Sequence, residues 1–285
     1  MNYVDRKEFK LDRRVHSLAF GAHNIVFGFE IGIECRTFEG TERWGKHQDT
    51  ATVMVFAPAE SYVIYADDRG VLNMRTIEKG ISSVLNKKCE GNPLQALFLN
   101  PKGDKLMAGD ASGHLLGWPA PFDGQPHIEQ FDSSAMVSIV SAPKREGYGC
   151  ASKRKIGYHL GGPRMLTFPV RHDITTLGLC TDPEKVVGIL IIVAQGNLLE
   201  VYDMRGNQVH TFACDSPVTS LAVHPQGEFF ATGEENGRVQ LWHPVKGRTC
   251  ELHNIGSRVD HLAFNSGRQL CAVSSRGVVA IFGKE

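Results

Sequence analysis

The chain has 285 residues, of which 42% are hydrophobic and 22% charged, a composition that fits a folded protein with a large core and argues against disorder. Lys plus Arg and Asp plus Glu each number 31, so no net field draws the chain to nucleic acid or to an anionic membrane. The longest apolar run, at 186–194, is nine residues long and predicts a buried strand, since a membrane-spanning helix needs about 20 residues.

The compartment follows from the start of the chain and from its cysteines. Residues 1–14 are charged throughout and lack the apolar stretch of a secretory signal. Seven cysteines are spread widely without a Cys-x-x-Cys pair, so we expect reduced thiols and no zinc site. Together these features favour a cytoplasmic location and no membrane contact.

A turn followed by an alternating strand recurs along the chain. The unit begins at Gly32, Gly70, Gly113, Lys155, Asn197, Gly237 and Gly277. The intervals between these positions are 38, 43, 42, 42, 40 and 40 residues. An apolar strand precedes each turn, and these strands start near residues 15, 51, 94, 136, 174, 218 and 259. Two independent markers therefore give seven copies of one repeat.

Each copy holds four short runs with period-two alternation, separated by clusters of Gly, Pro, Asn, Asp and Ser. A period of about 40 to 45 residues with four strands per copy is typical of a β-propeller. The sequence thus predicts an all-β fold, a seven-bladed β-propeller with four-stranded antiparallel blades. We expect residues 1–285 to form a single domain, because each blade must bury its faces against its neighbours.

The last repeat lacks a fourth strand, and the start of the chain supplies a candidate. Residues 7–12 contain the alternating pair Phe9 and Leu11. They resemble residues 250–254, which come just before the first strand of the seventh repeat. We expect residues 7–12 to pair with the last blade and to close the ring, which removes two exposed strand edges.

This organisation resembles the WD-repeat propeller family over essentially the whole chain. Aromatic residues occupy the family's Trp position in four repeats, at Trp118, Tyr202, Trp242 and Phe282. The residue directly before the turn Gly, where the family has Asp, is here Arg69, Ser112, Asn236 and Arg276. The Gly-His pair expected before the first strand is absent, so the family's Asp-His-Ser-Trp hydrogen-bond network is not carried over to any repeat.

Two short motifs have the spacing of a phosphate-binding loop and of a catalytic Ser-Lys pair, but neither lies in the structural context that such a site needs. Residues 40–47 have the outline of a phosphate-binding loop, but His47 stands where Ser or Thr would hold magnesium, and a strand follows instead of a helix. Ser141 and Lys144 have the spacing of a nucleophile and its base, but they fall on a strand end and a turn. We expect no catalytic residue, no cofactor and no metal.

The turns between second and third strands all emerge at one end of the blades, together with the connections that enter the first strands. Charged and polar residues at this rim form basic sectors in repeats seven, one and four and acidic sectors in repeats two and six, a pattern that suits a charged protein patch. The candidate partner-binding residues are Arg14, His16, Thr52, Asp67, Asp68, Gln95, Lys153, Arg154, Thr175, Thr219, Glu234, Glu235, Arg258, Asp260 and Arg276. Trp44 fits either buried packing or an interface.

The prediction for function is a non-catalytic scaffold or complex subunit that binds a protein or peptide on the propeller rim. Nucleic acid is not expected as a partner. The alternative is a propeller enzyme of the metal-dependent hydrolase type, which would gather ligands from several repeats around the central channel; the sequence alone leaves this open.

Overall fold

The computed structural model describes residues 3–48, 50–87, 89, 91–144, 146–161, 164–185 and 188–284. All regular structure in these ranges is β-strand. A search of this part of the chain finds no helix with the length and apolarity needed to cross a membrane. The chain divides into two compact units, Arg13–Ile139 and the pair of segments Met1–Asp12 and Val140–Glu285.

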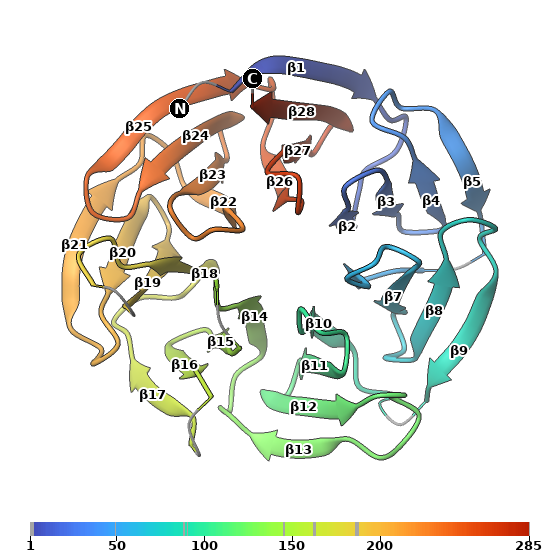
Figure 1. Ribbon diagram of the computed structural model, residues 1–285, viewed down its shortest axis with the longest axis horizontal. Helices are drawn as coiled ribbons and strands as arrows, with labels where there is room; N and C mark the ends of the chain where they lie inside the picture. Colours follow the sequence, from blue (N-terminus) through green and yellow to red (C-terminus); the bar gives the residue numbers. More distant parts are fainter. Residues whose placement is uncertain are drawn as a thin grey trace. The chain divides into compact units, whose positions relative to one another are not determined.

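The unit of residues 13–139 holds three four-stranded antiparallel sheets, called blades 1 to 3 (Figure 1). Blade 1 comprises β2 (Ser17–Phe20), β3 (Ile25–Gly28), β4 (Ile33–Arg36) and β5 (Glu42–Lys46). Blade 2 comprises β6 (Val53–Phe56), β7 (Tyr62–Ala66), β8 (Leu72–Thr76) and β9 (Ser82–Asn86). Blade 3 comprises β10 (Leu94–Leu99), β11 (Lys105–Asp110), β12 (His114–Pro119) and β13 (His127–Gln130).

Four further sheets, blades 4 to 7, complete the chain, and blade 4 begins at the boundary between the units. Blade 4 comprises β14 (Met136–Ser141), β15 (Tyr148–Ser152), β16 (Lys155–His159) and β17 (Leu166–Pro169). Blade 5 comprises β18 (Thr176–Thr181), β19 (Ile189–Gln195), β20 (Leu198–Tyr202) and β21 (Gln208–Ala213). Blade 6 comprises β22 (Val218–Val223), β23 (Phe230–Glu234), β24 (Arg238–His243) and β25 (Gly247–Asn254). Blade 7 comprises β26 (Val259–Phe264), β27 (Leu270–Ser274), β28 (Val278–Lys284) and β1 (Tyr3–Lys10).

The core lies between consecutive blades. One cluster joins blades 2 and 3 through side chains such as Ile64, Leu72 and Trp118. Another joins blades 5 and 6 through Ile192, Phe230 and others. Because strand side chains alternate between the two faces of a sheet, consecutive blades within each unit can bury apolar residues against each other.

β1 closes blade 7, as predicted (Figure 1). It pairs antiparallel with β28, from Tyr3 opposite Lys284 to Lys10 opposite Val278, and the N–H of Leu11 donates to the carbonyl of Gly277 at 2.8 Å. The strand differs from the predicted bounds of 7–12, since it starts at residue 3 and ends at residue 10. The reason is that β28 extends to residue 284. Its backbone N–H and C=O groups therefore pair also with residues that precede the apolar pair Phe9 and Leu11.

The predicted fold class, a seven-bladed β-propeller of four-stranded antiparallel blades, is confirmed. The first strands begin within two residues of every predicted start. The apolar run at 186–194 supplies the fully buried strand β19, while its residues 186 and 187 lie outside the described residues. All seven cysteines are free thiols, and all except Cys250 are buried.

Aromatic residues of the third strands are core residues. Trp118, Tyr202, Trp242 and Phe282 are all buried, and Trp242 Nε1 donates to Thr232 Oγ1 at 2.8 Å. Blade 2 has Arg75 at this position, buried with its guanidinium 5.5 Å from the ring centre of Trp44. Trp44 is itself buried, and its Nε1 donates to the carbonyl of Ile77 at 2.7 Å. Of the two roles open to Trp44, the structure selects packing.

Candidate partner-binding face

The turn face of a blade is defined here as the end that carries the turn between its second and third strands. Hydrogen bonds show that the connections between blades reach this end too. Asp68 bonds Thr50 in blade 2, Arg238 bonds Asp215 beside blade 6, and the N–H of Ser275 donates to the carbonyl of Arg258 in blade 7. The turns and connections that the sequence analysis selected are therefore neighbours within these blades.

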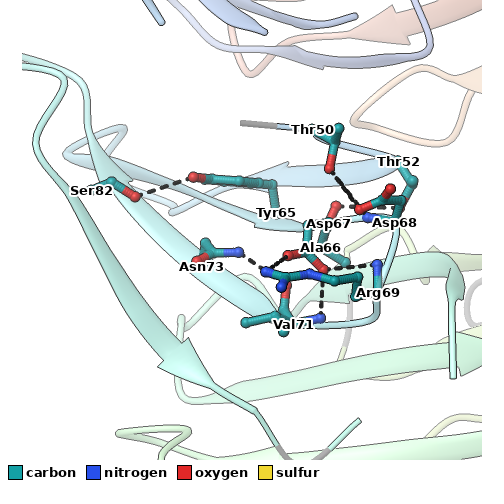
Figure 2. Close-up of polar contacts among 10 residues, drawn as sticks. All are labelled: Thr50, Thr52, Tyr65, Ala66, Asp67, Asp68, Arg69, Val71, Asn73 and Ser82. Atoms are coloured by element: carbon teal, nitrogen blue, oxygen red, sulfur yellow. Dashed lines mark hydrogen bonds and ion pairs between the residues drawn. The ribbon is translucent and has the colours of Figure 1, made fainter. Parts of the chain in front are cut away.

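The turn face of blade 2 is organised by Asp67 (Figure 2). Its Oδ1 accepts the backbone N–H groups of Arg69 at 3.0 Å and of Val71 at 2.8 Å, and its Oδ2 pairs with the Arg69 guanidinium at 3.1 Å. The turn ends at Gly70, whose φ of 85° suits glycine, and a Cβ there would meet the carbonyl oxygen of Cys89 at 2.4 Å. Asp67 is buried, so its carboxylate holds the turn in shape and is not an exposed contact group.

Asp68 and Arg69 are the exposed charges that this turn presents (Figure 2). Asp68 Oδ1 accepts from the Thr50 hydroxyl at 3.0 Å, which ties the turn to the connection entering β6. Thr52 is half-buried, and its amide and hydroxyl both donate to the carbonyl of Ala66. Of the predicted residues in blade 2, Asp68 is therefore the one whose side chain is exposed to solvent.

Blade 3 repeats the arrangement with Asp110. One carboxylate oxygen accepts the N–H groups of Ser112 and His114, each at 2.8 Å, and the other lies 2.8 Å from His114 Nδ1. Asn92, in the connection before β10, also donates to this carboxylate. The shared signal is an Asp three residues before the turn Gly, and the residue directly before that Gly, where the family has its Asp, does not reveal it. Gln95 is exposed on β10.

Blade 1 is the remaining blade of this unit. Arg14 and His16 are exposed in the segment before β2 and on its approach. Their neighbour Arg13 pairs with the buried carboxylate of Glu34, which also binds Arg36 at 2.9 Å. The basic sector predicted from Arg14, Arg258 and Arg276 draws on both units and remains a prediction.

Blade 6 carries the most unusual group of the turn face. Glu234 ends β23 and is fully buried, and neither of its carboxyl oxygens has a hydrogen-bond partner of normal geometry among the described residues. Burial, followed by the charge of Asp215, raises the pKa of Glu234 to about 7, while Arg238, Arg248 and a nearby backbone N–H favour the ionised form. Glu235, by contrast, is exposed.

A surface ion cluster lies next to this buried carboxyl. Asp215 Oδ2 accepts from Arg238 at 2.6 Å and from Arg248 at 3.0 Å. The hydrogen bond from Arg248, with the charges of both guanidinium groups, lowers the pKa of Asp215. The cluster is half exposed, so it adds little stability by itself but fixes the orientation of two cations at the turn face.

In blade 7 and its approach, Arg258 and Arg276 are exposed, and Arg258 Nε pairs with Asp260 Oδ1 at 2.7 Å. The hydroxyl of Thr219, on β22, donates to the carbonyls of Gly233 at 3.0 Å and Val259 at 2.6 Å. Thr219 thus links blades 6 and 7, and its hydroxyl is engaged in the protein.

Blade 4 and the connection that follows it gather positive charge. Lys153 and Arg154 lie in the β15–β16 turn and Thr175 lies just before β18, and all three are exposed. Arg171 and His172, which the sequence analysis did not select, lie in the same connection and are exposed as well. Their proximity to the turn depends on a fold contact that the sequence does not display.

No group of three or more His, Cys, Asp or Glu side chains with an arrangement suited to a metal ion occurs in the described part of the chain.

Comparison with known proteins supports the family resemblance. The model of the WD domain, G-beta repeat, matches residues 206–243, which run from the end of blade 5 through β24 of blade 6. The mitotic checkpoint protein bub-3 of Caenorhabditis elegans is 24% identical over 204 residues, which cover 64% of this chain and 59% of that protein. The protein LST8 homologs of Drosophila melanogaster and Drosophila pseudoobscura pseudoobscura are 25% and 24% identical over 137 residues, covering 46% of this chain and 42% of each homolog. The chain therefore matches only part of the length of these relatives.

Proposed function

Because the chain is a WD-repeat β-propeller, we propose that it is a non-catalytic interaction subunit that binds a protein or peptide on the turn faces of its blades. Exposed, oppositely charged side chains on neighbouring turns suit recognition by charge complementarity, which governs orientation and association rate. We further propose that the chain acts as a single domain and works in the cytosol, which fits the finding that none of its seven cysteines forms a disulfide.

The observation that carries this proposal is the contrast between fixed backbone and exposed charge in the same turns. Asp67 and Asp110 hold their turns through two backbone N–H groups each, while Asp68 and Arg69 remain at the surface. A surface whose backbone is already ordered loses less conformational freedom when a partner binds. The contact set we propose consists of the exposed predicted residues, Arg14, His16, Asp68, Gln95, Lys153, Arg154, Thr175, Glu235, Arg258 and Arg276.

The test is affinity capture with the full chain. Arg258→Glu combined with Arg276→Glu reverses two exposed charges on the turn face of blade 7. The matched control, Arg205→Glu with Lys246→Glu, reverses two exposed charges on turns between third and fourth strands, at the other end of blades 5 and 6. We expect the wild type and the control to retain the same partner proteins and the first variant to lose them. Equal capture by all three proteins would refute the proposal.

A further inference from the structure

Several basic residues lie in the β15–β16 turn of blade 4 and in the connection into blade 5. The basic corner is defined as Lys153, Arg154 and Arg171, with His172 beside them. Two backbone hydrogen bonds hold the turn against the connection: the N–H of Val170 donates to the carbonyl of Arg154 at 2.9 Å, and that of Ile174 donates to Lys153 at 2.7 Å. These side chains therefore project from two segments that are fixed to each other.

One carboxylate, Asp173, lies within this corner. Arg154 Nε binds Asp173 Oδ1 at 2.7 Å, with both side chains more than half exposed. That hydrogen bond, supported by the charges of Arg154, Lys153 and His172, lowers the pKa of Asp173. Asp173 is an internal example of the chemistry that the corner accepts, since a carboxylate is already bound there by a guanidinium group.

The corner keeps an excess of positive charge after this pairing. Within the described part of the chain, neither Lys153 nor Arg171 forms an ion pair with a carboxylate. Burial and the hydrogen bond to Glu200 raise the pKa of Tyr202, and the charge of Arg171 opposes this rise, so the field of Arg171 extends to that pair. In blade 6, by comparison, Arg238 and Arg248 share one carboxylate. Lys153 and Arg171 are thus two cations beside blade 4 that form no ion pair within the described residues.

We propose that the basic corner binds a carboxylate-rich segment, rich in Asp and Glu, of a protein partner. This inference rests on the proposed function and names the chemistry of one part of its surface. Guanidinium and ammonium groups on two segments that backbone hydrogen bonds hold together suit a chain with several carboxylates. Nucleic acid is disfavoured because the chain has 31 basic and 31 acidic residues, so no net positive charge attracts a phosphate backbone.

The probe for the test is a fluorescent glutamate-rich peptide, and the readout is its anisotropy with the full chain. We expect binding that weakens as salt is added, because the contacts are exposed charges. Lys153→Glu with Arg171→Glu should weaken binding by about tenfold or more. Arg205→Glu with Lys246→Glu should leave it unchanged. Both pairs are exposed, so the melting temperatures of the variants should match that of the wild type.

Three further probes separate this inference from its rivals: a lysine-rich peptide, a phosphoserine peptide of the same length and a single-stranded oligonucleotide. Tighter binding of the phosphopeptide or the oligonucleotide, or equal affinity of the glutamate peptide for the wild type and the Lys153, Arg171 variant, would overturn the inference. If partner capture still depends on Arg258 and Arg276 in that case, the proposed function stands and only the chemistry of the basic corner is wrong.

Discussion

Blades 2 and 6 have acidic side chains at the same place, where the second strand enters its turn, and the two carboxylates behave differently. Asp67 accepts two backbone N–H groups and the Arg69 guanidinium. Glu234 has no hydrogen-bond partner of normal geometry in the described residues, although it is more deeply buried. In its turn the amide oxygen of Asn236 accepts the N–H of Arg238 at 3.0 Å instead.

The difference follows from one methylene group. An Asp carboxylate is short enough to reach the N–H groups two and four residues further along its own turn, whereas Glu extends past them. The carboxyl group of the longer side chain is buried near Asp215, Arg238 and Arg248, and burial disfavours its charged form. An acidic residue therefore stabilises the turn of blade 2 through Asp67, whereas in blade 6 the acidic residue Glu234 is a buried group that titrates near neutral pH.

The largest expected effect comes from removing β1. The unfolding free energies of variants in blades 2 and 6 can be compared directly only if the whole chain unfolds in one transition, and β1 is expected to support that cooperativity. Deleting residues 1–12 exposes the edge of β28 and should lower the melting temperature by roughly 10 °C or more. Calorimetry of the wild type should show a single transition. Deleting only residues 1 and 2, which precede β1, is the control. An unchanged melting temperature for the longer deletion would contradict the closure.

Asp67→Ala tests the ordered turn. The substitution leaves the N–H groups of Arg69 and Val71 without their acceptor, so we expect a loss of about 2–3 kcal/mol in the free energy of unfolding. Asp68→Ala, one residue along and exposed, should change it by less than about 0.5 kcal/mol. Urea denaturation of both variants measures the difference, and equal stabilities would show that the Asp67 hydrogen bonds do not hold the turn.

Glu234→Gln tests the titrating turn. The pKa of Glu234 is raised in the folded protein from an ordinary value of 4.5 to about 7, so the folded state holds this proton more tightly. The resulting contribution to stability is complete below pH 4.5 and is lost as the pH rises through about 7. We expect the variant to exceed the wild type by on the order of 2 kcal/mol at pH 8 and to match it near pH 4.

Urea denaturation across this pH range gives the measurement for Glu234. The difference between the two proteins isolates this group from others that titrate in the same window. If the two proteins differ in unfolding free energy by the same amount at every pH, Glu234 ionises normally. In that case burial of Glu234 does not distinguish it electrostatically from Asp67.

Apart from the control Asp68→Ala, the substitution Asp110→Asn gives the smallest expected effect. The amide oxygen can still accept the N–H groups of Ser112 and His114, but the amide nitrogen replaces the oxygen that faces Asn92 and His114 Nδ1. We expect a loss of about 1 kcal/mol, between the values for Asp68→Ala and Asp67→Ala. A loss as large as that of Asp67→Ala would assign the stabilisation to the second carboxylate oxygen instead.

The sequence predicts the blades well because period and alternation are properties of each repeat taken alone. The seven first strands and the closing strand were found in this way, and so were the buried aromatic positions such as Trp118 and Trp242. The site is harder to predict. Asp67 and Glu234 belong to polar turns that suggest exposure, and only the direction of each side chain reveals that they are buried.

Arg171 shows the second limit of prediction from sequence. It stands 17 or more residues after the turn that it joins, and the backbone hydrogen bonds that bring the two segments together depend on the register of the whole blade. No short motif records that contact. The structural Asp residues, in contrast, do leave a signal, since Asp67 and Asp110 each stand three residues before a turn Gly.

The measurement that tests the account most directly is lysine-specific crosslinking of the full chain to a captured partner, followed by identification of the linked residues. Lys153 lies on the turn face and Lys246 lies in the turn at the other end of blade 6, and both are exposed. Recognition by the turn faces predicts partner crosslinks at Lys153 and none at Lys246. Crosslinks at Lys246 without any at Lys153 would place the partner at the other end of the blades and contradict the account.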